Sequence, residues 1–492
     1  MKIIHPLLFS RKRLSLLFSL VPLLLCIPAI VHSQWESDRR LTFDSDSSML
    51  SNNNARCIAA SGDTVHVVWY DRRAGNWKIY YKRSNDAGTT WSSDTSLSSG
   101  PASSINPSIA VSGPNVHLVW QDNRGGNWEI YYKRSTDQGT SWGVDTRLTT
   151  DAGESATPSL AVSDSLLHLV WSDNRYGANK IFYKFSQNCG GSWFSDRYLT
   201  GSHPGSHSVP CISISAASVH LVYVRYDSMG SSVIYKRSTD TGATWFPDTV
   251  LHSASSGPNS GTSFYYPSLF VADSIVLFVD VTNSWYRTLT QHWVSYLRSL
   301  NGGLSWGGNI ITSVTGAVYR SPAVWGCNRV TTFNVLVVWS DDRNGNNEIY
   351  HRWTFNGGIS WSGEIRLTND TSASITPFFA VQGPKVHVVW ADNRDGNYEI
   401  YYKRNLNGNY GVEVNEVISP ISRLPYSTHP NPFTSFVSVP GHSPERFALY
   451  DISGRKVGVY KGDRIGEGLS AGVYFLRPEG KDAKPLRVVK VR

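Results

Sequence analysis

Short apolar runs, most of them ending in tryptophan and an acidic residue, return along the chain at nearly regular intervals. The run "VHVVWYDRR" begins at residue 65, and related runs begin at residues 116, 167, 219, 276, 335 and 386. Successive starts therefore lie 51, 51, 52, 57, 59 and 51 residues apart. Self-similarity at a period of about 50 residues is the signature of a repeat architecture. The pattern predicts seven repeats.

Each repeat contains four short segments with the character of β-strands. In the second repeat, "PSIAVS" (107–112) and "VHLVW" (116–120) are followed by "EIYYKRS" (129–135) and "WGVDTRLT" (142–149). The segments are β-branched or aromatic and are bounded by Gly, Asn, Asp, Ser or Pro. Four strands per unit predict a propeller blade. We expect an all-β fold, a seven-bladed β-propeller over 34–418, with a sandwich or an open solenoid as the alternatives.

The start of the mature chain predicts how the ring closes. "WESDRRLT" (35–42) matches "WGVDTRLT" (142–149), so the chain opens with a lone fourth strand. We expect this strand to complete the last blade. The alternative is that "YGVEVNEVI" (410–418) supplies the last blade's own fourth strand.

An eight-residue motif, such as "STDQGTSW" (135–142), separates the third and fourth segments. Asp accepts hydrogen bonds from nearby backbone amides, Gly adopts the left-handed conformation, and Trp packs on the blade while its indole N–H seeks an acceptor. Repeats three, five and six carry Asn instead of Asp. Asn can still accept the hydrogen bonds of a turn, but it cannot act as a general acid or base. We therefore interpret the motif as structural. Its residues are Asp86, Gly88, Trp91, Asp137, Gly139, Trp142, Asn188, Gly190, Trp193, Asp240, Gly242, Trp245, Asn301, Gly303, Trp306, Asn356, Gly358 and Trp361.

These copies resemble the Asp-box, or bacterial neuraminidase repeat, of the sialidase-like β-propellers. The resemblance covers roughly 35–418 and implies the fold, but it does not bring an activity, because such propellers include hydrolases, receptors and binding proteins.

A sialidase of this family would need three arginines for the substrate carboxylate, a Tyr nucleophile paired with Glu, and an Asp acid/base. Arg56 departs from the repeat but lacks the family's flanking aromatic and proline, and Arg320 is another off-pattern arginine. Asp71 and Arg73 follow the first blade's second strand. By elimination only, Tyr265, Tyr266 and Glu364 remain for the other roles.

Several other polar and aromatic residues recur at one position of the repeat. We interpret the five Asp-x-Arg copies as ion pairs that brace a strand end. We interpret the Lys-Arg pairs after the third strands as solvated strand ends. A ring would spread the recurring histidines apart, so we expect no metal site and no cofactor. The loop aromatics either stack on sugar rings or pack between blades: Trp77, Trp128 and Tyr398.

The N-terminal residues have the features of a secretory signal peptide. Basic residues precede an apolar run from 14 to 30, and small Ser33 stands before the expected cut, so we assign 1–33 as the signal. No transmembrane segment is expected in the mature chain. Four cysteines remain after the signal, and whether any form a disulfide stays open.

The formal charge of +8 does not indicate a nucleic-acid partner. Residues 1–33 hold four basic and no acidic residues, and 427–492 hold eleven basic and six acidic. Subtracting both from 46 and 38 leaves 31 basic and 32 acidic residues for 34–426, a net charge of −1. The central body therefore has no general attraction for phosphate backbones.

The C-terminal segment has a sequence pattern that differs from that of the repeats. "HPNPF" (429–433), "FALYDISGRKV" (447–457), "GLSAGVYFL" (468–476) and "LRVVKVR" (486–492) indicate a small all-β module after a linker at 419–426. The module, 427–492, resembles the type A C-terminal sorting domain of the type IX secretion system, expected as a β-sandwich. The resemblance implies the translocation machinery as a partner and a secreted or outer-membrane surface location in a Gram-negative cell. An ordinary adhesive sandwich is the alternative.

Three functions follow as hypotheses. The first is a non-catalytic propeller that binds a glycan or a surface protein. The second is an exo-acting glycoside hydrolase of sialidase type, and the third is a structural surface component. Repeats four and five diverge most, above all at 281–296, which is where a specific site is expected.

Overall fold

The computed structural model describes residues 35–201, 203–228, 230–255, 260–286, 289–328, 333–407, 434–439, 446–479 and 486–491. The chain divides into two compact units, Met1–Val412 and Glu413–Arg492. The predicted signal peptide (1–33), the alternative last strand (410–418) and the linker (419–426) lie outside the described residues. All regular elements within the described ranges are β-strands, and these ranges contain no helix that is long and apolar enough to span a bilayer.

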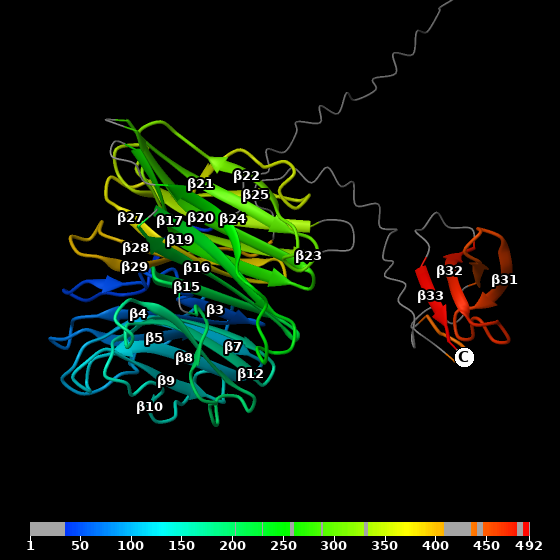
Figure 1. The fold of residues 1–492 in the computed structure, drawn as a ribbon, viewed down its shortest axis with the longest axis horizontal. Helices are drawn as coiled ribbons and strands as arrows, with labels where there is room; N and C mark the ends of the chain where they lie inside the picture. The colour runs from blue at the N-terminus through cyan, green and yellow to red at the C-terminus, as the bar shows by residue number, and fades with distance from the viewer. Residues whose placement is uncertain are drawn as a thin grey trace, which may run out of the picture. The chain divides into compact units, whose positions relative to one another are not determined.

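The described strands of the first unit form seven antiparallel sheets (Figure 1), and these are β-propeller blades in type. In six blades the strands follow one another in chain order from the first to the fourth. The first blade contains β3 (Ile58–Ser61), β4 (Thr64–Asp71), β5 (Lys78–Ser84) and β6 (Thr95–Ser96), and β2 (Ser48–Met49) also pairs with β4. The second contains β7 (Ser104–Ser112), β8 (Asn115–Asp122), β9 (Glu129–Ser135) and β10 (Thr146–Arg147), and the third contains β11 (Ser155–Ser163), β12 (Leu166–Asp173), β13 (Lys180–Ser186) and β14 (Arg197–Tyr198). The fourth contains β15 (Ser206–Ser215), β16 (Ser218–Asp227), β17 (Gly230–Ser238) and β18 (Thr249–Ser255).

The remaining blades include the one that joins the two ends of the ring. They are β19 (Ser260–Ala272), β20 (Ile275–Tyr286), β21 (Leu289–Ser299) and β22 (Gly307–Thr312); β23 (Tyr319–Asn328), β24 (Phe333–Asp341), β25 (Glu348–Thr354) and β26 (Ile365–Arg366); and β27 (Ser374–Gln382), β28 (Lys385–Asp392) and β29 (Glu399–Asn405), completed by β1 (Arg39–Arg40).

The blades are arranged in a circle. The first strands of successive blades contact one another in the order β3, β7, β11, β15, β19, β23, β27, and β27 contacts β3 again. The N-terminal strand β1 pairs antiparallel with β29, with Arg39 opposite Tyr402 and Arg40 opposite Tyr401. The sequence prediction that the N-terminal strand completes the last blade is therefore confirmed.

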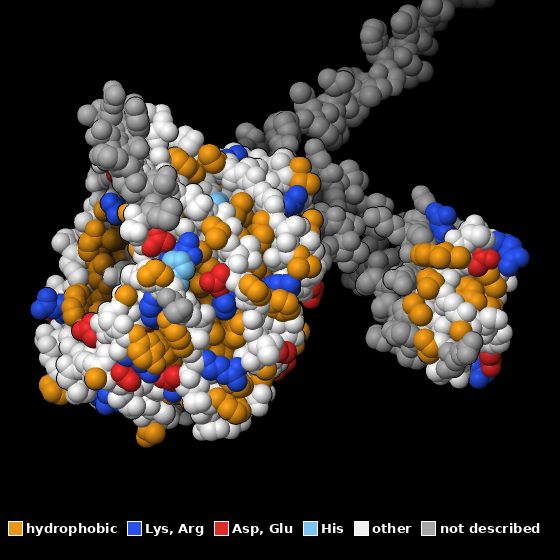
Figure 2. Space-filling view, viewed as in Figure 1, with side chains coloured by type: hydrophobic (Ala, Val, Ile, Leu, Met, Phe, Trp, Pro, Cys, Tyr) orange, Lys and Arg blue, Asp and Glu red, His pale blue; other side chains and the backbone are white. Residues whose placement is uncertain are grey.

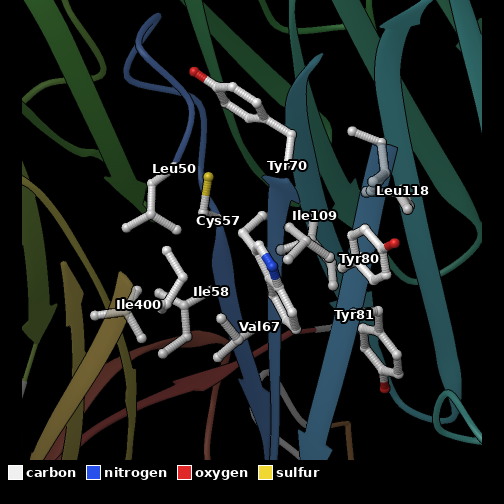
Figure 3. Close-up of a cluster of buried hydrophobic side chains, with 14 of the residues drawn as sticks. Leu50, Cys57, Ile58, Val67, Tyr70, Tyr80, Tyr81, Ile109, Leu118 and Ile400 are labelled. Atoms are coloured by element: carbon white, nitrogen blue, oxygen red, sulfur yellow. The ribbon is translucent and has the colours of Figure 1, made fainter. Parts of the chain in front are cut away.

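Apolar packing joins neighbouring blades. Figure 3 shows Ile58 and Val67 of the first blade beside Ile109 and Leu118 of the second and Ile400 of the last. All five side chains are buried. Because each blade buries both of its faces, the stability of one blade depends on its two neighbours.

The eight-residue motif is a hydrogen-bonded turn. In the second copy, Ser135 Oγ donates to Asp137 Oδ1 (2.7 Å), and the backbone N–H of Ser141 donates to the same oxygen (2.9 Å). Asn188 accepts the equivalent bond from Ser192 N–H at 2.9 Å. The turn therefore needs a side-chain oxygen and not a charge, which accounts for the Asn copies.

The tryptophan of this turn packs across the blade boundary, not only on its own blade as the sequence suggested. Each meets a tyrosine on the third strand of the preceding blade edge to face, with ring centroids between 4.9 and 5.2 Å apart. Among the described residues, the six indole N–H groups have no hydrogen-bond acceptor, which corrects the expectation of one. The pairs are Tyr402–Trp91, Tyr81–Trp142, Tyr132–Trp193, Tyr183–Trp245, Tyr235–Trp306 and Tyr296–Trp361.

The Lys-Arg pairs, expected at solvated strand ends, also join blades. Arg83 donates to the carbonyl of Gln138 (3.0 Å) in the next blade's turn, and Arg134 donates to that of Cys189 (2.8 Å). Lys82 donates to the carbonyl of Leu41 (2.6 Å). These contacts place the basic residues in the joints between blades.

The second unit contains one described four-stranded sheet. Its strands are β30 (Arg446–Tyr450), β31 (Lys456–Lys461), β32 (Gly472–Pro478) and β33 (Leu486–Lys490), in the order β31-β30-β32-β33. Phe447, Leu449 and Leu476 are fully buried in its core. A single bridge joins Val437 to Ile465.

Candidate functional site

The upper face of the ring is defined here as the end at which the first strands of the blades begin and the second strands end. Because the strands are antiparallel, the loops between second and third strands lie on this face, and the eight-residue turns lie on the opposite one. All the candidate residues from the sequence belong to the upper face or to strands that reach it, apart from Glu364 and the turn residues.

The Asp-x-Arg copies form ion pairs within their blades. Arg124 binds Asp122 (2.7 Å) at the end of the second strand and Asp145 (2.7 Å) before the fourth, and Lys133 also binds Asp145 (2.9 Å). Burial acts to raise the pKa of Asp122, but hydrogen bonds from Arg124, Ser104 and Trp120 outweigh it and hold that pKa below its usual range. In this blade the ion pairs therefore brace the second, third and fourth strands.

Asp71 and Arg73, candidates for substrate contacts, are part of such a brace. Arg73 binds Asp71 (2.6 Å) and Asp94 (2.7 Å), with Asp44 at 3.5 Å. Glu364, the candidate partner of a tyrosine nucleophile, binds Arg343 in the sixth blade. Asp71, Arg73 and Glu364 are therefore held in ion pairs within their own blades, and they do not lie together as the catalytic residues of a sialidase would.

The first-blade segment at 51–55 crosses the upper end of the central channel. Asn53 Nδ2 donates to the carbonyl of Pro158 (3.1 Å) in the third blade. Asn54 Nδ2 donates to the carbonyls of Tyr266 (3.1 Å) and Pro322 (2.7 Å) in the fifth and sixth blades. These bonds tie one segment to both sides of the ring.

Arg56 follows this segment and lines the channel. The channel cavity is about 210 Å³ and is lined mainly by apolar residues of all seven first strands. The Arg56 guanidinium donates to the carbonyl of Leu269 (3.4 Å) and has no ion-pair partner among the described residues. Desolvation by the surrounding ring walls lowers the pKa of Arg56. The side chain is nevertheless solvent-exposed in the channel, and the cavities that Arg56 and Arg320 line are separate.

We expect Arg56→Met to change the unfolding free energy by no more than about 0.5 kcal/mol, because the side chain is solvent-exposed and has no ion-pair partner among the described residues. A urea titration of the two proteins measures the change. A clear drop in the midpoint would instead show that the guanidinium stabilises the ring.

The loop aromatics are partly covered by the surrounding structure. Trp77, Trp128 and Tyr398 are all half-buried. Trp77 meets Tyr70 edge to face at 5.0 Å, and the Arg72 guanidinium lies 5.4 Å from its ring centroid. The carbonyls of Trp77 and Trp128 accept hydrogen bonds from the first strand of the next blade. The Trp77 ring therefore packs within its own blade, whereas the bonds to the next blade are made by backbone and leave both interpretations of the three rings open.

Arg320 lines a pocket of about 250 Å³ between the fifth and sixth blades. Two tyrosines, Tyr265 and Tyr266, line the same pocket, with ring centroids 6.2 Å apart. Arg320 is exposed and, within the described ranges, has neither an ion pair nor a side-chain hydrogen bond, in contrast to Arg73 and the other brace arginines. The structure therefore brings three of the candidate residues together.

Two further polar residues line this pocket. Asn283 and His292 are cross-strand partners at the upper ends of β20 and β21. The Asn283 Oδ1 is buried and has no hydrogen-bond partner in the described part of the chain. Burial lowers the pKa of His292, with Asp342 raising it and Arg320 lowering it again, so the ring is neutral near pH 7. The sequence did not single out these two residues, although both lie in the divergent stretch at 281–296.

Charge on the surface is mixed. Figure 2 shows blue and red side chains interspersed on the visible face of the first unit, with no broad region of one sign. No group of three or more His, Cys, Asp or Glu side chains in the described residues is placed to hold a metal ion. Cys57, Cys189 and Cys211 are free thiols.

Comparison with known proteins places the fold among glycan-active propellers. No protein-family model matches the chain, and no curated protein matches it. The polysaccharide lyase Uly1 superposes with a TM-score of 0.54 at 11% identity, covering 76% of this chain and 99% of the lyase. An ulvan lyase with bound -[GlcA(1-4)Rha3S]- superposes at 0.51 and 10% identity, covering 74% and 95%. The Trypanosoma rangeli sialidase gives 0.42 at 10% identity, covering 61% and 54%.

At such identities the likeness concerns the fold alone. The chain is an all-β protein built of four-stranded antiparallel blades, and its solved neighbours are propeller-type enzymes that act on glycans.

Proposed function

We propose that this protein is a seven-bladed β-propeller that is exported by a type IX system and binds an acidic glycan at the Arg320 pocket without cleaving it. The observation that carries the proposal is the guanidinium of Arg320, which has no ion-pair partner in the described part of the chain and lies beside Tyr265 and Tyr266. Guanidinium groups bind carboxylates through paired hydrogen bonds, and aromatic rings pack against the apolar face of a sugar. A uronate residue offers both features.

Two further points support this proposal. The fold resembles that of polysaccharide lyases, one of which binds a glucuronate-containing chain. The acids that a sialidase-type hydrolase would need are held in ion pairs, as Asp71 and Glu364 show. The signal-like N-terminus and the C-terminal module that resembles a sorting domain support a secreted or surface location.

Calorimetric titration of the mature protein with glucuronate-containing and matched neutral oligosaccharides tests the proposal. We expect only the acidic chains to bind this pocket, and Arg320→Ala to weaken that binding about 10- to 100-fold, since a charged hydrogen-bond partner contributes about 1.5–3 kcal/mol. Arg72→Ala, which removes another exposed arginine of the upper face, is the matched control. Unchanged affinity in Arg320→Ala would reject the site, and release of sugar or of an unsaturated product would reject the absence of catalysis.

A further inference from the structure

Five blades bury an aromatic pair at one cross-strand position, whereas the fourth has Tyr223 opposite Ile234 there and the fifth has no aromatic residue. In the second blade Trp120 of β8 lies opposite Tyr131 of β9, and the two rings stack. Trp69–Tyr80, Trp171–Phe182, Trp339–Tyr350 and Trp390–Tyr401 repeat this stack. In the fifth blade the same cross-strand position holds Asp280 and Ser295.

The charged brace beside the pair is missing from the fifth blade as well. By the register of the repeat, Thr282 stands where the second blade has Asp122, and Ser284 stands where it has Arg124. Leu297 replaces the lysine of the third strand and pairs with Gly308, at the position of the second aspartate. The substitutions remove two rings and four charges from one side of one blade together.

A groove occupies the space that these groups leave. It has a volume of about 730 Å³ and lies between β18 of the fourth blade and β21 and β22 of the fifth. Its lining includes the replaced residues Thr282, Ser295, Leu297 and Gly308. A volume of this size is within the range of about 300–1,000 Å³ for small-molecule sites.

The polar groups of the groove are fixed in place. His252, from β18, contacts the buried Asp280 through its Nδ1 (3.0 Å to Oδ2). Because a carboxylate only accepts, Nδ1 carries a proton in this contact, which leaves Nε2 for a hydrogen bond to a ligand. The hydroxyls of Thr282 and Ser295 are 3.0 Å apart. Asp280 is fully buried, and its Oδ1 has no partner among the described residues.

We propose that this groove is a second ligand site and that it binds a neutral saccharide. His252 Nε2 and the Thr282 and Ser295 hydroxyls supply acceptors and donors for sugar hydroxyls, and Trp293 and Phe264 supply apolar ring surface. No lysine, arginine or carboxylate lines the groove, so nothing there favours a charged sugar. This inference does not rest on the Arg320 pocket.

Restoring the residue of the repeat tests the proposal. Ser295→Tyr should refill the groove with the tyrosine that four other blades carry there, so the thermal midpoint should stay the same or rise. Titration uses neutral hexasaccharides of β-1,4-glucan, β-1,3-glucan, β-1,4-mannan and β-1,4-xylan. We expect at least one to bind the native protein, Ser295→Tyr to lower that affinity at least about tenfold, and His252→Ala to lower it with the fold intact.

Arg320→Ala is the matched control and should leave this binding unchanged, which separates the two sites. Equal affinity in Ser295→Tyr and the native protein would overturn the assignment. Absence of binding by all four neutral chains, or binding in the groove by glucuronate chains only, would overturn the ligand class.

Discussion

Acidification from pH 7 to about pH 4 is expected to destabilise the propeller unit steeply. Five histidines at one position of the repeat are buried, and each contacts a tyrosine hydroxyl of its own blade through Nδ1. Burial is the main cause that lowers the pKa of each to about 4, from 6.5 for an exposed histidine. They are His66, His117, His168, His220 and His387.

The sign of the effect follows from the lowered pKa. Between about pH 6.5 and pH 4 the unfolded chain binds protons that the folded chain does not, so the unfolding free energy falls as the pH falls through this window. Each histidine contributes at most about 3 kcal/mol, since one pKa unit corresponds to about 1.4 kcal/mol. The buried Nε2 atoms have no acceptor among the described residues, so a proton there would be an unpaired buried charge.

Urea midpoints at pH 7, 6 and 5 measure this dependence. The glutamine of His117→Gln is neutral at every pH. This variant should be less stable at pH 7, but its unfolding should take up about one proton fewer, so its unfolding free energy should change less with pH. Midpoints that do not change between pH 7 and pH 5 would show that the histidines are protonated in the folded state.

Gly88→Ala is expected to destabilise the ring by about 3–5 kcal/mol, whereas Gly75→Ala should cost only about 1–2 kcal/mol. Both glycines have φ of +86°, so both variants carry the same strain of a left-handed backbone. A Cβ at Gly75 meets nothing within 4 Å, but a Cβ at Gly88 would overlap the phenol of Tyr402. That tyrosine packs on Trp91 at the junction of the first and last blades.

The difference in unfolding free energy between the two variants therefore measures the cost of the clash with Tyr402 at the junction, because the backbone strain is the same in both. Thermal and urea unfolding of both variants, beside the native protein, measure it. Equal losses in the two would mean that the Tyr402 ring moves aside at little cost.

The fold was largely predictable because repetition supplies seven readings of the same pattern. The spacing of the "VHLVW" runs predicted the strands, and the match of 35–42 to 142–149 predicted the pairing of β1 with β29. The contacts across blade boundaries were not predictable. Tyr132 and Trp193 belong to different repeats, and only the angle between blades decides that their rings meet.

The candidate site was predicted in part. Arg320 was found because it departs from the repeat, Tyr265 and Tyr266 were named by elimination only, and the three residues share one pocket. Arg56 departs from it too, yet it faces the channel, because a sequence pattern does not show which way a side chain points. Alignment of the repeats places Asp280 where most of the other blades have a tryptophan. Only the structure shows that the space of the missing aromatic rings remains open as a groove.

The pairing of β1 with β29 sets an order of events during biosynthesis. Arg40 and Glu399, which bond across this pair, are 359 positions apart. The first strand to emerge therefore has no partner until the last repeat has been made, and the intervening chain must close a very long loop at an entropic cost. A newly made chain is thus an open arc whose two end strands stay unpaired until the ring closes.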